Sequence, residues 1–221
     1  MTIAEEPKKI RAEIQRRNIT RVCHFTRLEN IRSIHDHGIL STRSLDVKKR
    51  SGTINDFEQN DDQRLDEDYG ISCSVQFPNI RLLRKWMDYK YSGISWVILN
   101  LNPEVLCNNG AVNKFCETNA ATQRGALVQC GSQGFKSMFK DQIQTATGKL
   151  IRDSSLHSSS TTDIQAEALL YGPIEWSQIQ SITTHSESDQ RELQESFSDV
   201  NVIFHQESFT YSYINSGRSL F

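Results

Sequence analysis

One carboxylate in the second half of the sequence has the setting of a catalytic group. Glu167 lies in the run 165–170, which a Ser/Thr-rich stretch (154–162) precedes and Gly172-Pro173 ends, and these bounds predict a β-strand. Because side chains alternate along a strand, Glu167 falls on the face opposite the predicted core face, which consists of Ala166, Ala168 and Leu170. A carboxylate on a rigid strand beside a long flexible loop suits catalysis; the alternative is a solvated glutamate on an exposed face.

A histidine near the N-terminus precedes a predicted helix start. His24 is near the end of a predicted strand at 21–25, and Thr26-Arg27-Leu28-Glu29 fits a capping box, which predicts a helix that begins at Thr26 and ends at Gly38. The free N–H groups of a helix N-terminus favour a bound phosphate, and Asn30 lies just past this first turn. The alternative is a purely structural capping box with His24 in the core or on the surface.

An arginine that could clamp phosphate lies in a long polar segment. Residues 41–69 show little periodicity, which predicts a loop with at most a helical turn, and loops of this length are often functional lids or disordered. Arg64 stands among several aspartates in this segment. Its planar guanidinium suits a phosphate, and the alternative is a solvated charge in an acidic loop.

The composition excludes some broad classes of protein. The chain has 221 residues with 37% hydrophobic and 24% charged residues, as expected for one globular domain with a sizeable core. A formal net charge of −2 argues against a general polyanion binder, so any nucleic-acid contact requires a local basic patch. No apolar run is long enough to span a membrane, and residues 1–17 lack the apolar core of a secretion signal.

The five cysteines carry no metal-binding or disulfide pattern. Their spacing contains no Cys-x-x-Cys pair, so the sequence predicts no metal site. An odd number of thiols, several of them inside predicted strands or a helix, favours buried, reduced cysteines and a cytoplasmic location.

The remaining pattern predicts an α+β fold in one domain. A charged helix is expected at 4–17, and the segment 108–134 is expected to be irregular. Further strands and helices alternate along the chain without internal repeats. The predicted strands are 71–77, 95–101, 180–184, 201–205 and a final one at 209–214; the predicted helices are 80–90, 134–144 and 189–197.

Four stretches, in order along residues 21–185, resemble motifs of the DarT family of nucleic-acid ADP-ribosyltransferase toxins. No one of them is specific alone, but four in the right order are. The second is similar to the guanine-modifying branch of that family. The stretches are His24-Phe25-Thr26-Arg27-Leu28-Glu29-Asn30-Ile31; Asp62-Gln63-Arg64-Leu65-Asp66 with Ser72–Asn79; Phe115 with Thr118-Asn119-Ala120-Ala121; and Asp163-Ile164-Gln165-Ala166-Glu167-Ala168-Leu169.

The resemblance implies a fold, a reaction and site residues. It implies two small packed sheets with flanking helices and an NAD cleft, in a domain of 1–221 with an N-terminal helix (1–20) and a catalytic core (21–205). NAD would be the ADP-ribose donor, Glu167 and Arg64 would be catalytic, and Arg64 would also contact NAD. His24, Thr26 and Asn30 would bind NAD as well.

The acceptor and partners also follow from the resemblance. The acceptor would be a base, most simply guanine, in single-stranded DNA, because a paired base hides its reactive edge. Single-stranded RNA is the alternative acceptor, and a non-catalytic NAD- or nucleic-acid-binding module is the alternative class. The toxin would have an antitoxin, such as a macrodomain ADP-ribosyl hydrolase, and a role in phage defence. The predicted nucleic-acid contacts are Lys136, Lys140, Lys149, Arg152 and His157.

Overall fold

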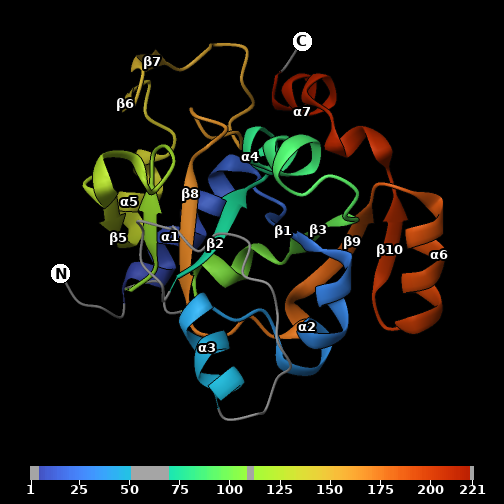
Figure 1. The fold of residues 1–221 in the computed structure, drawn as a ribbon. Helices are drawn as coiled ribbons and strands as arrows, with labels where there is room; N and C mark the ends of the chain where they lie inside the picture. Colours follow the sequence, from blue (N-terminus) through green and yellow to red (C-terminus); the bar gives the residue numbers. More distant parts are fainter. Residues whose placement is uncertain (1–4, 51–69, 109–111, 220–221) are drawn as a thin grey trace.

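The sheet of this protein consists of two four-stranded halves. The computed structural model describes residues 5–50, 70–108 and 112–219. Within them, eight strands form one sheet in the order β10-β9-β3-β1-β2-β8-β4-β5, and β6 and β7 form a separate hairpin (Figure 1). The strands are β1 (Val22–Arg27), β2 (Gly70–Val75), β3 (Trp96–Leu101), β4 (Lys114–Cys116), β5 (Val128–Cys130), β6 (Gln142–Thr145), β7 (Gly148–Ile151), β8 (Glu167–Tyr171), β9 (Ile179–Thr184) and β10 (Asn201–Phe204).

The two halves meet at β1 and β2 through a short antiparallel contact. Strand β1 pairs with β3 along all six of its residues, but it pairs with β2 only at Val22–Val75 and Cys23–Ser74. Beyond that point the His24 side chain contacts the Ser72 carbonyl, with 2.9 Å between Nδ1 and O. The α+β class is confirmed, and the two expected small sheets are the two halves of one continuous sheet.

Helices cover both faces of this sheet. The α-helices are α1 (Glu6–Arg17), α2 (Ile31–His37), α3 (Thr42–Arg50), α4 (Ile80–Lys85), α5 (Gly131–Ser137), α6 (Glu187–Ser196) and α7 (Tyr211–Arg218). Single turns of 3₁₀ helix are η2 (Leu28–Asn30), η4 (Pro103–Leu106), η5 (Thr122–Gly125), η6 (Trp176–Gln178) and η7 (Gln206–Phe209), and Trp86–Lys90 (η3) forms a π-helical turn that extends α4. None of the described helices is long and apolar enough to cross a membrane.

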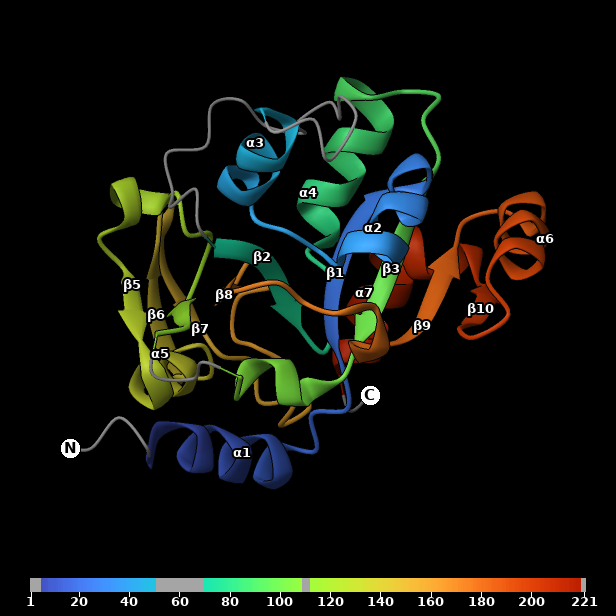
Figure 2. The ribbon, with the colours of Figure 1, turned by 90° about the horizontal axis from the view of Figure 1, so that it is seen from below.

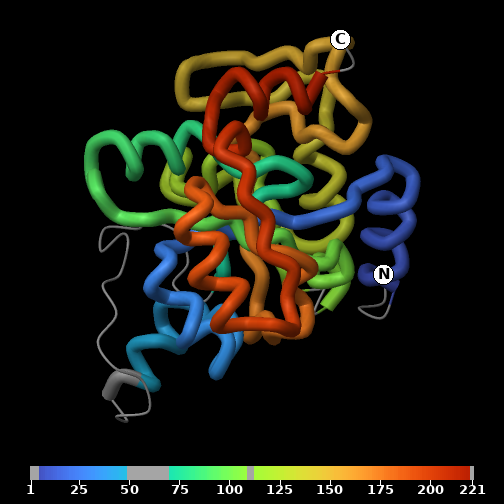
Figure 3. The backbone as a smooth tube through the Cα atoms, turned by 90° about the vertical axis from the view of Figure 1, so that its right-hand side faces the viewer, coloured from blue at the N-terminus to red at the C-terminus, as the bar shows by residue number. Residues whose placement is uncertain are grey.

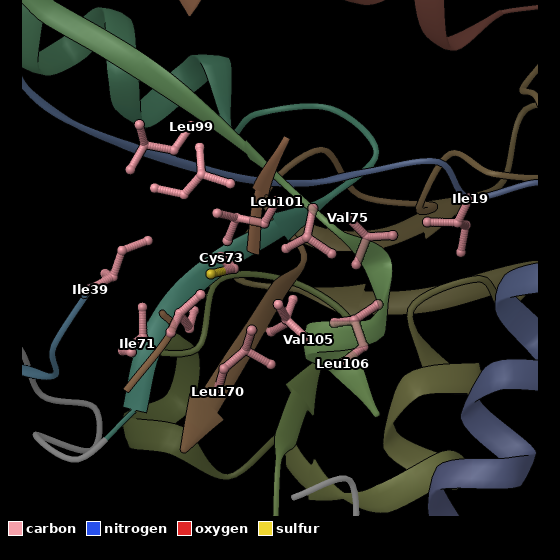
Figure 4. Close-up of a cluster of buried hydrophobic side chains, with 14 of the residues drawn as sticks. Ile19, Ile39, Ile71, Cys73, Val75, Leu99, Leu101, Val105, Leu106 and Leu170 are labelled. Atoms are coloured by element: carbon pink, nitrogen blue, oxygen red, sulfur yellow. The ribbon is translucent and has the colours of Figure 1, made fainter. Parts of the chain in front are cut away.

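The two larger of three apolar clusters among the described residues lie on the two sides of the sheet. The larger one joins alternate residues of β2, β3 and β8 to α1, α2, α5 and α6, and Figure 4 shows its centre around Cys73, Leu101 and Leu170. The smaller one contains Trp96 and Ile98 of β3 together with α4, η7 and α7. Strand β3 is therefore buried on both faces, which confirms the prediction of a central strand.

The capping box predicted at Thr26 is wrong. Strand β1 continues through Arg27, the 3₁₀ turn η2 follows, and the α-helix begins only at Ile31. The backbone of Thr26 pairs with Val97 in the β1–β3 ladder, and its hydroxyl accepts a hydrogen bond from the Asn30 side chain at 2.9 Å. Pairing in the sheet thus overrides the local capping signal. The predicted end at Gly38 is confirmed: its φ is 75°, and a Cβ there would lie 2.7 Å from the Ile174 carbonyl oxygen.

The final predicted strand at 209–214 is also wrong, because these residues form the end of η7 and the start of α7. A strand would place Phe209, Tyr211 and Tyr213 on one face, yet Phe209 is buried and both tyrosines are exposed. Thr210 caps α7 by accepting the Tyr213 N–H.

Three segments expected to be loops or helices differ in type or position. The polar segment 41–69 contains α3, and the segment 108–134 contains β4, β5 and the start of α5. The helix expected at 134–144 is α5, which ends at Ser137, and Gln142–Thr145 forms β6 instead. Strand pairing with distant residues places these elements, and such pairing leaves no local signature.

The N-terminal helix α1 lies beside α5, as predicted in extent (Figure 2). Its Glu6 carboxylate accepts the Ser132 N–H at 2.6 Å, at the start of α5. This contact joins α1 to the start of α5, the helix that directly follows the edge strand β5 of the sheet half that contains β8.

Candidate active site

Glu167 is buried and held through both carboxylate oxygens. It is the first residue of β8, which lies between β4 and β2, and only 5% of it is exposed. Its Oε1 accepts a hydrogen bond from the Ser72 hydroxyl, and its Oε2 accepts the Ala120 N–H at 2.8 Å. The alternative of a solvated glutamate is therefore wrong. Ala168 and Leu170 face the larger core as predicted.

Ser72 connects Glu167 to the predicted histidine. Its hydroxyl donates to Glu167, and its carbonyl oxygen lies 2.9 Å from His24 Nδ1. A carbonyl oxygen can only accept, so Nδ1 of His24 carries the proton in this contact. Ser72, at the junction between the two halves of the sheet, therefore contacts His24 through its carbonyl oxygen and Glu167 through its hydroxyl.

Thr26 and Asn30 form the second predicted part of the site. Thr26 lies two residues after His24 on β1 and so shares its face of the strand. Its side chain is buried and accepts the hydrogen bond from Asn30 described above. This hydrogen bond orients both side chains, although neither of them caps a helix.

The turn Thr118-Asn119-Ala120-Ala121 packs against the Glu167 strand. Asn119 accepts the Ala121 N–H at 3.0 Å through its side chain, which shapes the turn. Thr118 donates to Asp163 at 2.7 Å, and Ala120 donates to Glu167. The third and fourth stretches are therefore joined by two hydrogen bonds, one of which goes to the Glu167 carboxylate.

The Ser/Thr-rich segment before Glu167 is packed rather than exposed along its second half. Residues 159–163 are all buried. Arg152 donates to the carbonyls of Ser160 and His157, each at 2.7 Å, while Arg218 of α7 donates to the carbonyl of Thr161. The expected flexible loop is thus a hydrogen-bonded segment, because the half-buried Arg152 and the buried Arg218 donate to its backbone carbonyls.

The five predicted nucleic-acid contacts lie around α5 and the β6–β7 hairpin. Lys136 is 3.7 Å from a Glu13 oxygen, and Lys140 is 3.0 Å from a Glu117 oxygen. Arg152 bonds the segment before Glu167, and His157 is exposed within that segment. Lys149 is exposed on β7. Three of the five thus already have partners within the protein.

Burial keeps a cysteine next to the carboxylate unreactive. Cys116 lies opposite Glu167 in the β4–β8 ladder and is fully buried. Burial raises the pKa of its thiol to about 11, and the nearby Glu167 charge acts in the same direction. The thiol is therefore protonated at neutral pH and is not a nucleophile. Among the described residues, no group of three or more His, Cys, Asp or Glu side chains could hold a metal ion.

The other predicted catalytic residue, Arg64, lies outside the described residues. Four contributors had no predicted role in the site: the Ser72 hydroxyl, the Ala120 N–H, and the side chains of Asp163 and Arg218. Ser72, Ala120 and Asp163 do lie within the stretches that resemble the family motifs. Ser72 carried a detectable signal, because it is a polar residue between apolar ones in a predicted strand. The others act through backbone groups or distant packing.

Comparison with known proteins identifies the family. The family model described as "DarT: ssDNA thymidine ADP-ribosyltransferase, DarT" matches residues 23–211. No curated protein matches the sequence.

Solved structures show the same fold at low sequence identity. Thermus sp. 2.9 DarT in complex with NAD+ is 12% identical, with a TM-score of 0.56 over 86% of this chain and 98% of that one. The same protein with ADP-ribosylated ssDNA gives 12% and 0.55 over 87% and 97%. Thermosipho africanus DarTG in complex with ADP-ribose is 15% identical, with a TM-score of 0.57 over 86% of this chain and 51% of that one.

The matched region contains all the contacts described for Glu167, from His24 on β1 to the strand itself. It omits α1 and most of α7. This chain therefore belongs to the DarT family of ssDNA ADP-ribosyltransferases.

Proposed function

We propose that this protein transfers ADP-ribose from NAD to a base of single-stranded DNA, with Glu167 as the catalytic carboxylate. The observation that carries the proposal is the fixed carboxylate: Ser72 and Ala120 hold its two oxygens, and Ser72 also contacts His24. A buried side chain held at both ends is pre-organised for one orientation. Family membership supports the reaction class.

The chemistry needs one well-placed negative charge. The bond between nicotinamide and the ribose C1′ breaks, nicotinamide leaves as a neutral molecule with the bonding electrons, and the ribose gains positive charge, as in glycoside cleavage. A carboxylate beside the ribose stabilises that charge. A base nitrogen then bonds to C1′ and loses its proton, which Glu167 can accept as a general base.

The donor NAD is proposed to bind next to the β1–β2 junction. His24, Thr26 and Asn30 would contact NAD there, and Arg64 would clamp its phosphates or place the acceptor base. The complexes of Thermus sp. 2.9 DarT with NAD+ and carba-NAD+ support NAD as the donor. The catalytic core would span 21–205, with 1–20 as an N-terminal helix.

The acceptor is proposed to be guanine in single-stranded DNA. The complex of the Thermus protein with ADP-ribosylated ssDNA supports single-stranded DNA as the acceptor. The family model is described for thymidine, whereas Arg64-Leu65-Asp66 with Phe77-Pro78-Asn79 resembles the guanine-modifying branch. Duplex DNA would be a poor substrate, because opening a base pair adds a few kcal/mol to the barrier.

A cognate antitoxin is proposed as partner, with a role as the toxin in phage defence. The similarity of the fold to Thermosipho africanus DarTG supports a toxin with a partner. A macrodomain hydrolase that removes the modification is one form that such an antitoxin would take.

Mass mapping of modified oligonucleotides tests this function. Oligomers that contain one guanine, one thymine or neither are incubated with NAD, as single-stranded DNA, as duplex and as single-stranded RNA. The expected result is a gain of one ADP-ribose on guanine in single-stranded DNA. Labelling of thymine alone would make thymine the acceptor base instead of guanine. Labelling of RNA alone would make RNA the acceptor instead of DNA, and no labelling at all would favour a non-catalytic module.

A further inference from the structure

The C-terminal end of α7 lies against the segment that leads into the Glu167 strand. Figure 3 shows α7 beside the chain that runs from the β6–β7 hairpin to β8. The carbonyl of Arg218 accepts the His157 N–H at 2.8 Å and the Ser160 hydroxyl at 3.0 Å, and Ser219 forms a bridge with Leu156. This contact lies beyond residue 211, where the family match ends.

The Arg218 side chain is buried there as a positive charge. Only 5% of the residue is exposed, and its guanidinium donates to the Thr161 carbonyl. Burial lowers the pKa of this group to about 10, and the opposing effect comes from the charge of Asp163. The group is therefore still charged at neutral pH, and the cost of burying it is offset by its hydrogen bond to Thr161 and by the charge of Asp163.

A line of hydrogen bonds runs from this guanidinium to Glu167. The Thr161 hydroxyl donates to the Asp163 carbonyl at 2.6 Å, so the residue that Arg218 holds is itself bonded to Asp163. The Asp163 carboxylate accepts the Thr118 hydroxyl at 2.7 Å. Two residues further along the turn, the Ala120 N–H reaches Glu167 at 2.8 Å.

We infer that Arg218 is a positioning residue for the transfer reaction, which acts on Glu167 through Asp163 and the Thr118–Ala121 turn. This inference rests on the proposed function. Loss of the guanidinium removes the donor to the Thr161 carbonyl, while Arg152 and the Arg218 backbone still hold His157 and Ser160. Thr161 and, through its hydroxyl, Asp163 then shift, and the turn that donates to Glu167 loses its fixed position. The residues proposed to contact NAD, His24, Thr26 and Asn30, lie on β1 and η2 and take part in none of these hydrogen bonds, so NAD affinity should change little.

The test is a double-mutant cycle between Arg218→Met and Thr118→Val. Each single variant should lower kcat for transfer by about ten- to a hundredfold, because small displacements of a catalytic group cost factors of this size. The dissociation constant of NAD should stay within about twofold of that of the wild type in both. The double variant should be little slower than the worse single variant, because both substitutions break the same line.

Further variants separate positioning from general stability. Arg191→Met, on the exposed face of α6, should leave kcat unchanged. Arg218→Lys keeps the charge but not the planar fork, so it should recover part of the lost kcat, and it replaces Arg218→Met in the cycle if that variant does not fold. Multiplying effects in the double variant, or a kcat per folded molecule equal to that of wild type, would overturn the inference. An inactive wild-type protein would instead refute the proposed function.

Discussion

The Ser72 hydroxyl donates a hydrogen bond to the Glu167 carboxylate across the β2–β8 pair. The neighbouring register pairs Ser72 with Leu169 and Cys73 with Ala168, so the two polar side chains are next to each other on the face opposite the larger core. The same serine contacts His24 through its carbonyl. One residue in a strand therefore links both halves of the candidate active site.

Ser72→Ala should slow transfer without unfolding the protein. The substitution removes the hydrogen bond from Ser72 to Oε1, so the carboxylate is held less firmly in its orientation while its charge remains. The expected loss in kcat is about tenfold to a hundredfold, somewhat below the loss of a direct donor to the transition state. Ser177→Ala, at an exposed position, is the matched control. Transfer by Ser72→Ala at the rate of wild type would contradict the role given to this bond.

The bond between Glu6 and Ser132 should make stability depend on pH. The Ser132 N–H lowers the pKa of the Glu6 carboxyl from its ordinary value of 4.5. A lowered pKa in the folded state means that the contribution is fully present above pH 4.5 and is lost as the pH falls through the folded-state pKa.

Glu6→Gln should therefore reduce the free energy of unfolding by about 1 kcal/mol at pH 7, as for loss of a helix cap. Urea unfolding of the variant and of the wild type, at intervals from pH 7 to pH 3, measures the difference. This difference should shrink below pH 4.5. Glu5→Gln, at an exposed neighbouring position, serves as control. A difference between the Glu6 variant and the wild type that is constant with pH would contradict the assignment.

Lys149 should contribute more to DNA binding than Lys136. Lys149 is exposed on the β6–β7 hairpin, and no carboxylate of the described residues forms an ion pair with it, whereas Lys136 lies near Glu13. Lys149→Ala should weaken binding of single-stranded DNA and lower the slope of log affinity against log salt by about 0.7. Lys136→Ala should change both less. Binding titrations with single-stranded DNA at several salt concentrations measure both slopes. Equal slopes for Lys149→Ala and wild type would show that Lys149 does not contact the DNA.

The sequence predicted the elements that carry their own periodicity. The charged helix α1 and the buried strand β3 were found where expected, and so was the strand of Glu167. The helix at Thr26 and the strand at 209–214 were wrong, because sheet pairing and burial by distant residues decide those segments.

The site was predictable only in part for the same reason. His24 and Glu167 stand out by residue type and setting, and the structure brings them together through Ser72. The Ala120 N–H and the buried Arg218 have no local signature, since a backbone donor occurs at almost every residue and the task of Arg218 depends on a segment nearly 60 residues away in sequence.

The proposed reaction depends most on Glu167 as a catalytic rather than a structural carboxylate. Glu167→Gln keeps the size of the side chain and an acceptor oxygen for Ser72 or Ala120, so the protein should fold with an unfolding midpoint close to that of wild type. The direct measurement is the single-turnover rate of ADP-ribose transfer to a single-stranded DNA oligomer at saturating NAD. The expected rate is lower than that of wild type by about 10²–10³, with NAD affinity nearly unchanged. A folded Glu167→Gln protein that transfers at the rate of wild type would refute the catalytic role of Glu167.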